Sequence, residues 1–200
     1  KTFDLPVQLH QLGSFSYQGT AKGFYHQFAI NGAAQTDLGS IETKSSVELK
    51  PVLAYSGKVT SSSFDLGTVL HAKNIGTTAF DIDFEGSGSR RESLRLWASG
   101  DLQNINFRKY SYQNLTFEGE VASEVFVVNG YLDDQFASLT YDGTVDLSGQ
   151  SPIYQFSSDI KKLDLKKLKL FEKDSIVISN SNIQGDLHGS SLNSLNGNIS

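Results

Sequence analysis

The chain has 200 residues and a formal net charge of −5, and this length is enough to bury a sizeable core. Its basic residues are scattered except around Lys161 to Lys169, so the phosphate-binding footprint of a nucleic-acid-binding protein is absent. Cysteine is absent, which excludes disulfides, thiol catalysis and cysteine-ligated zinc.

One pattern recurs along the chain: an apolar residue, an aromatic or apolar residue two positions later, then a glycine and a further apolar residue at the same spacing. Aligned on the glycine, its copies and near-copies are FSYQGTA (15–21), LAYSGKV (53–59), IDFEGSG (82–88), LWASGDL (96–102), LTFEGEV (115–121), LTYDGTV (139–145), SNIQGDL (181–187) and SLNGNIS (194–200). Residues i, i+2 and i+4 of a strand share a face. The pattern therefore predicts strands with one apolar and one polar face.

Further alternating runs, such as EVFVVNGYL (124–132), lie between these copies, and clusters of Ser, Asn, Asp and Gly separate them. Short strands with such punctuation predict an all-β antiparallel meander of roughly a dozen strands. The spacing of the copies is irregular, so the chain is not a strict solenoid. We expect residues 1–200 to form a single β-repeat segment of a longer protein, without an internal boundary.

A second motif, Asp-Leu followed by Gly, Ser or Lys, occurs in TDLG (36–39), FDLG (64–67), VDLSG (145–149) and LDLKKLKLF (163–171). It fits a chain that leaves a strand through a tight turn, where Asp accepts hydrogen bonds from nearby amides and Gly adopts a positive φ. In DLKKLKLFE the leucine spacing mixes two periodicities, so a helical turn and a non-helical turn stay open there.

The sharpest candidate for chemistry is DIDFEGSGSRRE (81–92). Five of its residues match places of an EF-hand calcium loop: Asp81, Asp83, Glu85, Gly86 and Glu92. An EF-hand also needs flanking helices and usually an apolar residue at its eighth place, which is Gly88 here. Phe80, Ile82 and Phe84 alternate with the acidic residues, as in a half-buried strand. We therefore expect a polar strand face here and no metal.

Catalytic motifs are missing as well. The four histidines, His10, His26, His71 and His188, have no metal-ligand spacing, and no serine lies in a G-x-S-x-G elbow. Asp133 and Asp134 are adjacent, as in a turn, and no glycine-rich nucleotide loop is present. The sequence predicts a protein that is not an enzyme and needs no cofactor.

The segment KKLDLKKLKLF (161–171) has two interpretations. It is either a basic amphipathic patch that touches anionic lipid or a solvated turn whose lysines keep a strand soluble, and the second is favoured because the segment is short and lacks Trp.

The apolar face of so many strands must be covered by a second sheet, by closure into a barrel, by curling of the sheet, or by a ligand. No long helix is predicted, and no apolar run approaches the roughly 18 residues of a membrane helix. Glycine within a strand lets a sheet bend or lets a ligand approach the backbone. A bend within an ordinary sandwich and a curled sheet with an open apolar groove both stay open on this evidence.

Several longer stretches resemble the periplasmic repeat region of bacterial AsmA-like proteins, of the TamB type (translocation and assembly module) found in Bacteroidota. These are LGSFSYQGTAKGFYHQFAINGAAQTDLGSIET, LAYSGKVTSSSFDLGTVLHAKNIG, RKYSYQNLTFEGEV and SDIKKLDLKKLKLF, and the resemblance covers about residues 10–200. It implies a long antiparallel sheet curled into a taco-like trough with an apolar inner face. It further implies a periplasmic location, a parent protein anchored in the inner membrane, and a partner of the Omp85-family outer-membrane barrel type that binds outside this segment.

On this resemblance the trough shields the acyl chains of phospholipid on their way between the two membranes and supports outer-membrane biogenesis. The residues expected to line it are Tyr17, Tyr55, Val59, Phe84, Leu96, Phe117, Val121, Val128, Tyr141 and Val145. The glycines expected to let the sheet curl are Gly19, Gly57, Gly86, Gly119 and Gly143.

Two other classes stay open. A surface adhesion or carbohydrate-binding β-sandwich would present aromatic residues from loops and from the polar face, and an exposed Trp97 beside polar neighbours would favour it. An outer-membrane barrel would carry aromatic girdles at its strand ends, whereas the aromatic residues here lie in mid-strand beside glycine.

Overall fold

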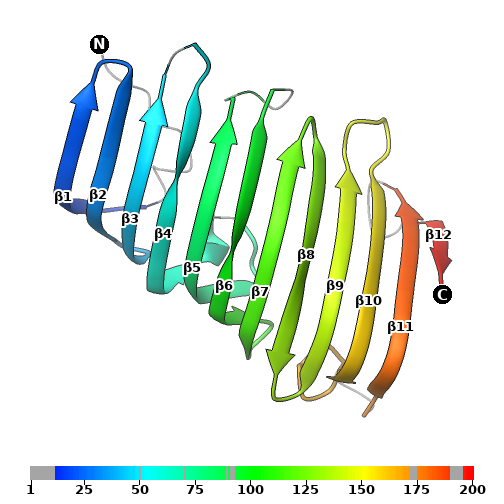
Figure 1. The fold of residues 1–200 in the computed structure, drawn as a ribbon. Helices are drawn as coiled ribbons and strands as arrows, with labels where there is room; N and C mark the ends of the chain where they lie inside the picture. Colours follow the sequence, from blue (N-terminus) through cyan, green and yellow to red (C-terminus); the bar gives the residue numbers. More distant parts are fainter. Residues whose placement is uncertain are drawn as a thin grey trace.

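The computed structural model describes residues 12–49, 51–69, 71–88, 90, 93–171, 175–189 and 196–200. The described strands form one sheet in which β1 to β12 follow each other in chain order, each antiparallel to the next (Figure 1). The elements are β1 (Phe15–Phe24), β2 (Gln27–Thr36), β3 (Gly39–Glu48), β4 (Ala54–Asp65), α2 (Leu66–Val69), β5 (Ile75–Ser87), β6 (Arg95–Phe107), β7 (Tyr110–Ala122), β8 (Val125–Asp134), β9 (Ala137–Asp146), β10 (Ile153–Asp164), β11 (Val177–His188) and β12 (Asn196–Ile199). The predicted all-β antiparallel meander is confirmed.

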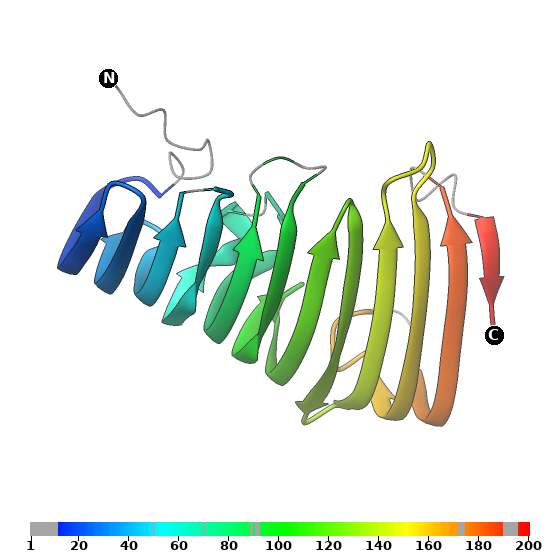
Figure 2. The ribbon, with the colours of Figure 1, turned by 45° about the horizontal axis from the view of Figure 1, so that its top comes forward.

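The sheet is open. Within the described part of the chain β1 and β12 are its two edges, and they do not pair with each other (Figure 2). No second sheet lies against it, so the sandwich architecture that accompanied the adhesion alternative is not formed by these residues.

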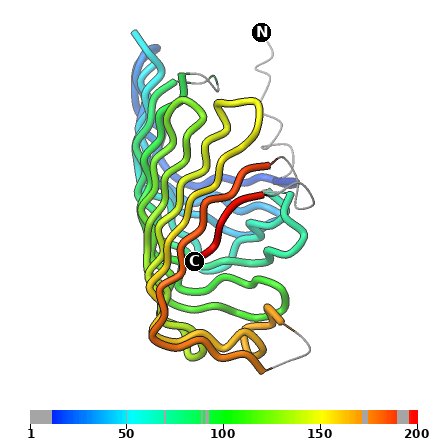
Figure 3. Tube along the Cα trace, turned by 90° about the vertical axis from the view of Figure 1, so that its right-hand side faces the viewer, coloured from blue at the N-terminus to red at the C-terminus, as the bar shows by residue number. Residues whose placement is uncertain are grey.

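The strands bow along their length. Viewed from the β12 edge, the sheet has a C-shaped cross-section (Figure 3), and α2, the β6–β7 turn and the 165–171 turn all lie on its concave side. This arrangement agrees with the predicted curled trough. All three covering segments come from the end of the sheet that carries the β4–β5, β6–β7 and β10–β11 connections, which is lower in Figure 1 and is called the lower end from here on.

The best-buried part of the protein lies at this lower end. Tyr112, Leu132, Ala137 and Leu168 are at most 8% exposed and form one cluster. Leu168 belongs to the 165–171 turn, and the Tyr112 hydroxyl donates a hydrogen bond of 3.0 Å to its backbone oxygen. The cluster therefore fixes the turn onto the concave side of the sheet.

The aspartate part of the Asp-Leu prediction is confirmed in three of the four motifs, whereas the predicted positive φ is wrong for Gly67, which lies in α2, and for Gly149. A carboxylate oxygen of Asp65, Asp146 and Asp164 accepts a hydrogen bond from the backbone N–H of Thr68, Ser148 and Lys167, respectively. In the first motif the backbone N–H of Ser14 bonds to Asp37 instead, and Gly39 adopts a φ of 131°. Residues 164–171 form hydrogen-bonded turns that include one helical bond, from the Leu168 N–H to the Asp164 oxygen at 3.1 Å, without a continuous α-helix.

Candidate functional site: the concave apolar face

The register of the hairpins places the recurring motif into rows that run across the strands. Opposed residues share a face, so each row consists of residues on one side of the sheet. The middle row is Gly57, Phe84, Ala98, Gly119, Val128, Gly143, Phe156 and Gly185. The row above it is Tyr55, Gly86, Leu96, Val121, Phe126, Val145, Tyr154 and Leu187.

Two further rows lie nearer the lower end. The first is Val59, Ile82, Gly100, Phe117, Gly130, Tyr141, Ser158 and Ile183. The second is Phe80, Leu102, Leu115, Leu132, Leu139 and Ile160. The four rows together define the apolar face.

All ten residues named from the resemblance fall on the apolar face, and so do the five glycines. Gly19 is connected to the row of Val59 through its cross-strand partners Gly32 and Thr43. Tyr17 lies two residues before Gly19 on β1 and therefore shares its face. The 165–171 turn packs on this same face, since Leu168 clusters with Leu132. The apolar face is therefore the concave one.

The spacing of aromatic residue and glycine has a direct structural cause. A side-chain carbon on Gly130 would overlap the Tyr141 ring, and one on Gly86 would overlap the Tyr55 ring. Each tyrosine thus extends over the glycine of the neighbouring strand. Tyr141 reaches across β8 to donate a hydrogen bond of 2.8 Å to the Thr116 carbonyl on β7. Glycine in these places lets aromatic side chains cover the sheet instead of standing up from it.

The glycines differ in the space above them. Gly19, Gly57 and Gly86 are closely approached by neighbouring atoms, from Tyr17, Ser45 and Tyr55 among others. Above Gly143 the nearest atom to an added Cβ would be a Val128 methyl at 3.6 Å, and above Gly119 the Val127 carbonyl oxygen at 3.2 Å. Of the glycines beside Val128, Gly143 thus has room for a further carbon at ordinary contact distance, whereas Gly119 is more tightly approached.

The apolar face is covered at the lower end and accessible above it. Phe80, Leu132 and Ile160 of the lowest row are 5–7% exposed. Phe126 and Val128 in the upper two rows are 41% and 37% exposed. The protein's own core fills one side of the trough, and the upper rows form an apolar surface that faces solvent.

Three large residues of this accessible surface were missing from the predicted set: Phe126, Tyr154 and Phe156. Phe126 lies in a run that the sequence had already marked as alternating, and Tyr154 and Phe156 alternate in IYQFSS without a following glycine. The alternation of apolar and polar residues along these strands is the signal that would have found them. Alignment on the glycine missed them, because it considered only segments with a glycine at the motif position.

The opposite face is polar. Asp81, Asp83 and Glu85 lie on β5 as the strand interpretation predicted, and Lys58 Nζ contacts an Asp81 carboxylate oxygen at 2.6 Å and one of Asp83 at 3.9 Å. This contact, first through its hydrogen bond to Asp81, raises the pKa of Lys58. Glu92 and His10 lie outside the described residues. Within the described part of the chain, no group of three His, Asp or Glu side chains could hold a metal ion.

Trp97 also lies on the polar face, opposite Glu85 and Glu120 of the adjacent strands. Its side chain is 39% exposed, and its indole N–H donates a hydrogen bond of 3.1 Å to Glu118. An exposed Trp97 with polar neighbours is the feature that favours the adhesion alternative.

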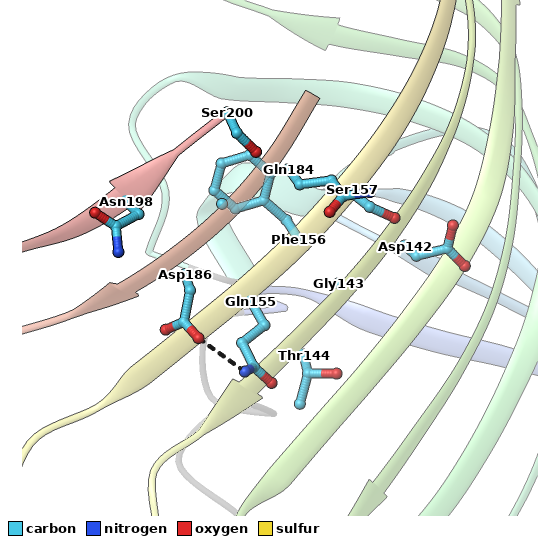
Figure 4. Close-up of a pocket in the computed structure, with 11 residues that line it drawn as sticks. Asp142, Gly143, Thr144, Gln155, Phe156, Ser157, Gln184, Asp186, Asn198 and Ser200 are labelled. Carbon is cyan, nitrogen blue, oxygen red and sulfur yellow. Dashed lines mark hydrogen bonds between the residues drawn. The ribbon is translucent and has the colours of Figure 1, made fainter. Parts of the chain in front are cut away.

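The polar face carries shallow hollows between its side chains. The one drawn in Figure 4 has a volume of about 410 Å³ and lies between β9 and β12. The Gln155 amide donates a hydrogen bond of 3.1 Å to Asp186 across it. Its serines, Ser157 and Ser200, have no histidine beside them among the lining residues. The hollow offers hydrogen bonds to a polar ligand but no nucleophile paired with a base.

None of the helices that the structure describes is both long and apolar enough to span a bilayer. Comparison of the chain with protein-family models, with curated proteins and with solved structures finds no match.

Proposed function

We propose that this chain is a non-enzymatic lipid-binding segment that shelters the acyl chains of phospholipid on the accessible rows of its concave apolar face. The observation that carries the proposal is the continuity of those rows. From β4 to β11 the two upper rows contain only glycine, alanine, aliphatic and aromatic side chains, two of them tyrosines, and eight strands spaced by about 4.8 Å span roughly 34 Å.

An acyl chain is the ligand that suits such a surface. It has no hydrogen-bonding groups to satisfy, and each CH₂ removed from water contributes about 0.8 kcal/mol. The room at Gly143 lets a chain lie close to the backbone beside Val128. Headgroups stay in water, outside the bowed sheet.

The same conclusion follows from the resemblance to AsmA-like proteins of the TamB type. On that basis we propose a periplasmic location, transport between the inner and outer membranes, and an Omp85-family partner that binds a different part of the parent protein. The curled, open sheet supports this assignment because a trough needs an uncovered concave face.

The test is native mass spectrometry with lipid extraction on protein purified without detergent. We expect the wild-type protein to carry phospholipid and Val128→Glu to lose it, because a carboxylate among apolar rows repels an acyl chain. Val128 is preferable to Phe117 or Tyr141, since it is 37% exposed and lies outside the buried cluster.

Val127→Glu is the matched control. Val127 precedes Val128 on β8, is 46% exposed and lies on the polar face, so its variant should retain lipid. Wild-type protein that is free of lipid, or equal retention by the two variants, would refute the lipid-binding role of this face.

A saccharide-binding or adhesion role is the second candidate, and the exposed Trp97 on the polar face is the observation that favours it. The same experiment separates the two, because protein that is free of lipid yet carries sugar lost in Trp97→Ala would assign function to the polar face.

A further inference from the structure

Basic side chains that are far apart in the sequence gather at the lower end of the sheet. The β6–β7 turn supplies Arg108 and Lys109, and β10 with the following turn supplies Lys162, Lys166, Lys167 and Lys169. The two groups are joined through the core, since Arg108 lies over the Phe107 ring, Phe107 contacts Tyr112, and Tyr112 bonds to Leu168. These six residues are called the basic edge below.

The charges of the basic edge are not neutralised by neighbours. The salt bridges of the described residues join Lys58 to Asp81 and Asp83, and no residue of the basic edge takes part. Asp134 is buried and accepts hydrogen bonds from the Tyr110 hydroxyl and from the backbone of Gln113 and Phe136.

Two other acidic residues lie at the lower end, at the ends of β8 and β10. Asp164 bonds to the backbone of its own turn, and Asp133 is exposed. Glu172 and Asp174 lie outside the described residues. Among the described residues of this end, the six cations of the basic edge outnumber the carboxylates of Asp133, Asp134 and Asp164, so the described surface here is positive.

Aromatic rings are interleaved with these cations. Lys162 Nζ and Lys167 Nζ lie 5.8 and 5.9 Å from the centre of the Phe136 ring, and Arg108 lies 5.5 Å from that of Phe107. Phe171, at the end of the turn, is 51% exposed. Basic residues beside partly exposed aromatic rings are typical of surfaces that contact the headgroup region of a membrane.

We propose that the basic edge docks on an anionic lipid surface. The β6–β7 and β10–β11 connections lie at the same end of the sheet and are joined by the Tyr112–Leu168 contact, so their cations gather in one region that can face a charged surface together. A negatively charged leaflet attracts such a region within a Debye length, about 8 Å at physiological salt. This docking does not depend on the apolar face. It replaces the solvated-turn interpretation of 161–171, because the sequence alone did not show that Arg108, Lys109 and Phe136 lie beside that segment.

Vesicle flotation tests the proposal. The wild-type protein should float with vesicles of equal parts phosphatidylcholine and phosphatidylglycerol, and should stay unbound with phosphatidylcholine alone. The variant Lys166→Gln/Lys167→Gln/Lys169→Gln should bind about 100-fold more weakly, since each charge near such a surface contributes about fivefold. Binding should also fall steeply at 1 M salt, where the Debye length is about 3 Å.

Lys22→Gln/Lys44→Gln/Arg95→Gln is the matched control, because it removes three exposed cations elsewhere and should bind like the wild type. Circular dichroism should show both variants folded. Equal binding to neutral vesicles, or unchanged binding of the first variant, would overturn the proposal. Equally tight binding to duplex DNA would replace it with a general polyanion surface. The outcome does not depend on retained lipid, which Val128→Glu tests.

Discussion

Tyr141 and Gly130 show how single residues shape this sheet. The tyrosine ring crosses β8 above the glycine, and its hydroxyl reaches the Thr116 carbonyl on β7. Burial of the ring raises the pKa of the Tyr141 hydroxyl, so the group stays protonated and remains a donor at neutral pH. A pair of this kind joins three strands and leaves the apolar face smooth.

Gly130→Ala should destabilise the protein by about 2 kcal/mol, because the new methyl overlaps the Thr116 carbonyl oxygen and the Tyr141 ring. Gly143→Ala should be neutral or stabilising by up to about 1 kcal/mol, since its nearest contact is 3.6 Å and alanine loses less backbone entropy on folding. Urea unfolding of the two variants measures the difference. Equal changes in the free energy of unfolding would show that the Tyr141 ring does not need a glycine at position 130.

At the scale of elements, the 165–171 turn closes the lower end of the trough. Its leucine, Leu168, is fully buried against Tyr112, and the lysines on either side point away from that core and are exposed. Burial is the main cause that raises the pKa of Tyr112. Leu168 is thus the buried anchor of the turn, and Leu170 packs beside it on the same cluster.

Leu168→Ala should lower the free energy of unfolding by about 3 kcal/mol, through lost burial and the cavity left behind. Phe171→Ala serves as the control, because Phe171 is half exposed and its loss should cost far less. Urea unfolding gives both values. Spectroscopic titration of the tyrosines should also show the pKa of Tyr112 moving back towards its ordinary value in Leu168→Ala alone. An unchanged titration would mean that the turn does not seal this site.

At the scale of the whole molecule, the sheet is a linear array. Every strand pairs only with its chain neighbours, and each edge has one unpaired side within the described residues. The buried cluster supports β6 to β10, whereas the side chains of β1 are exposed throughout. Stability should therefore vary along the array.

Amide hydrogen exchange should show the strongest protection in β7 to β9 and the weakest in β1 and β12. The reason is that the edge strands can separate without opening the Tyr112–Leu168 cluster. Exchange rates of the denatured chain provide the reference. Uniform protection across all strands would contradict the linear array and indicate one cooperative unit.

The sequence predicted the strands, the meander and the two faces. Val127 and Val128 illustrate why: side chains alternate with a period of two in any strand, so assignment to a face needs no tertiary information. The turns at Asp65 and Asp146 were predictable for a similar reason, because the aspartate bonds within its own local segment. The apolar-face residues between Tyr55 and Val145 could therefore be predicted from the alternation of the sequence alone.

The tertiary structure alone decided which part of the apolar face stays accessible. Leu168 covers Leu132 and meets Tyr112 across 56 residues of chain, and no local pattern encodes that contact. It also decided that the rings of Tyr55 and Tyr141 lie over glycines of other strands, and that Arg108 joins Lys167 at one edge. Local alternation fixes which way a side chain points, whereas register, curvature and the packing of distant turns fix what it meets.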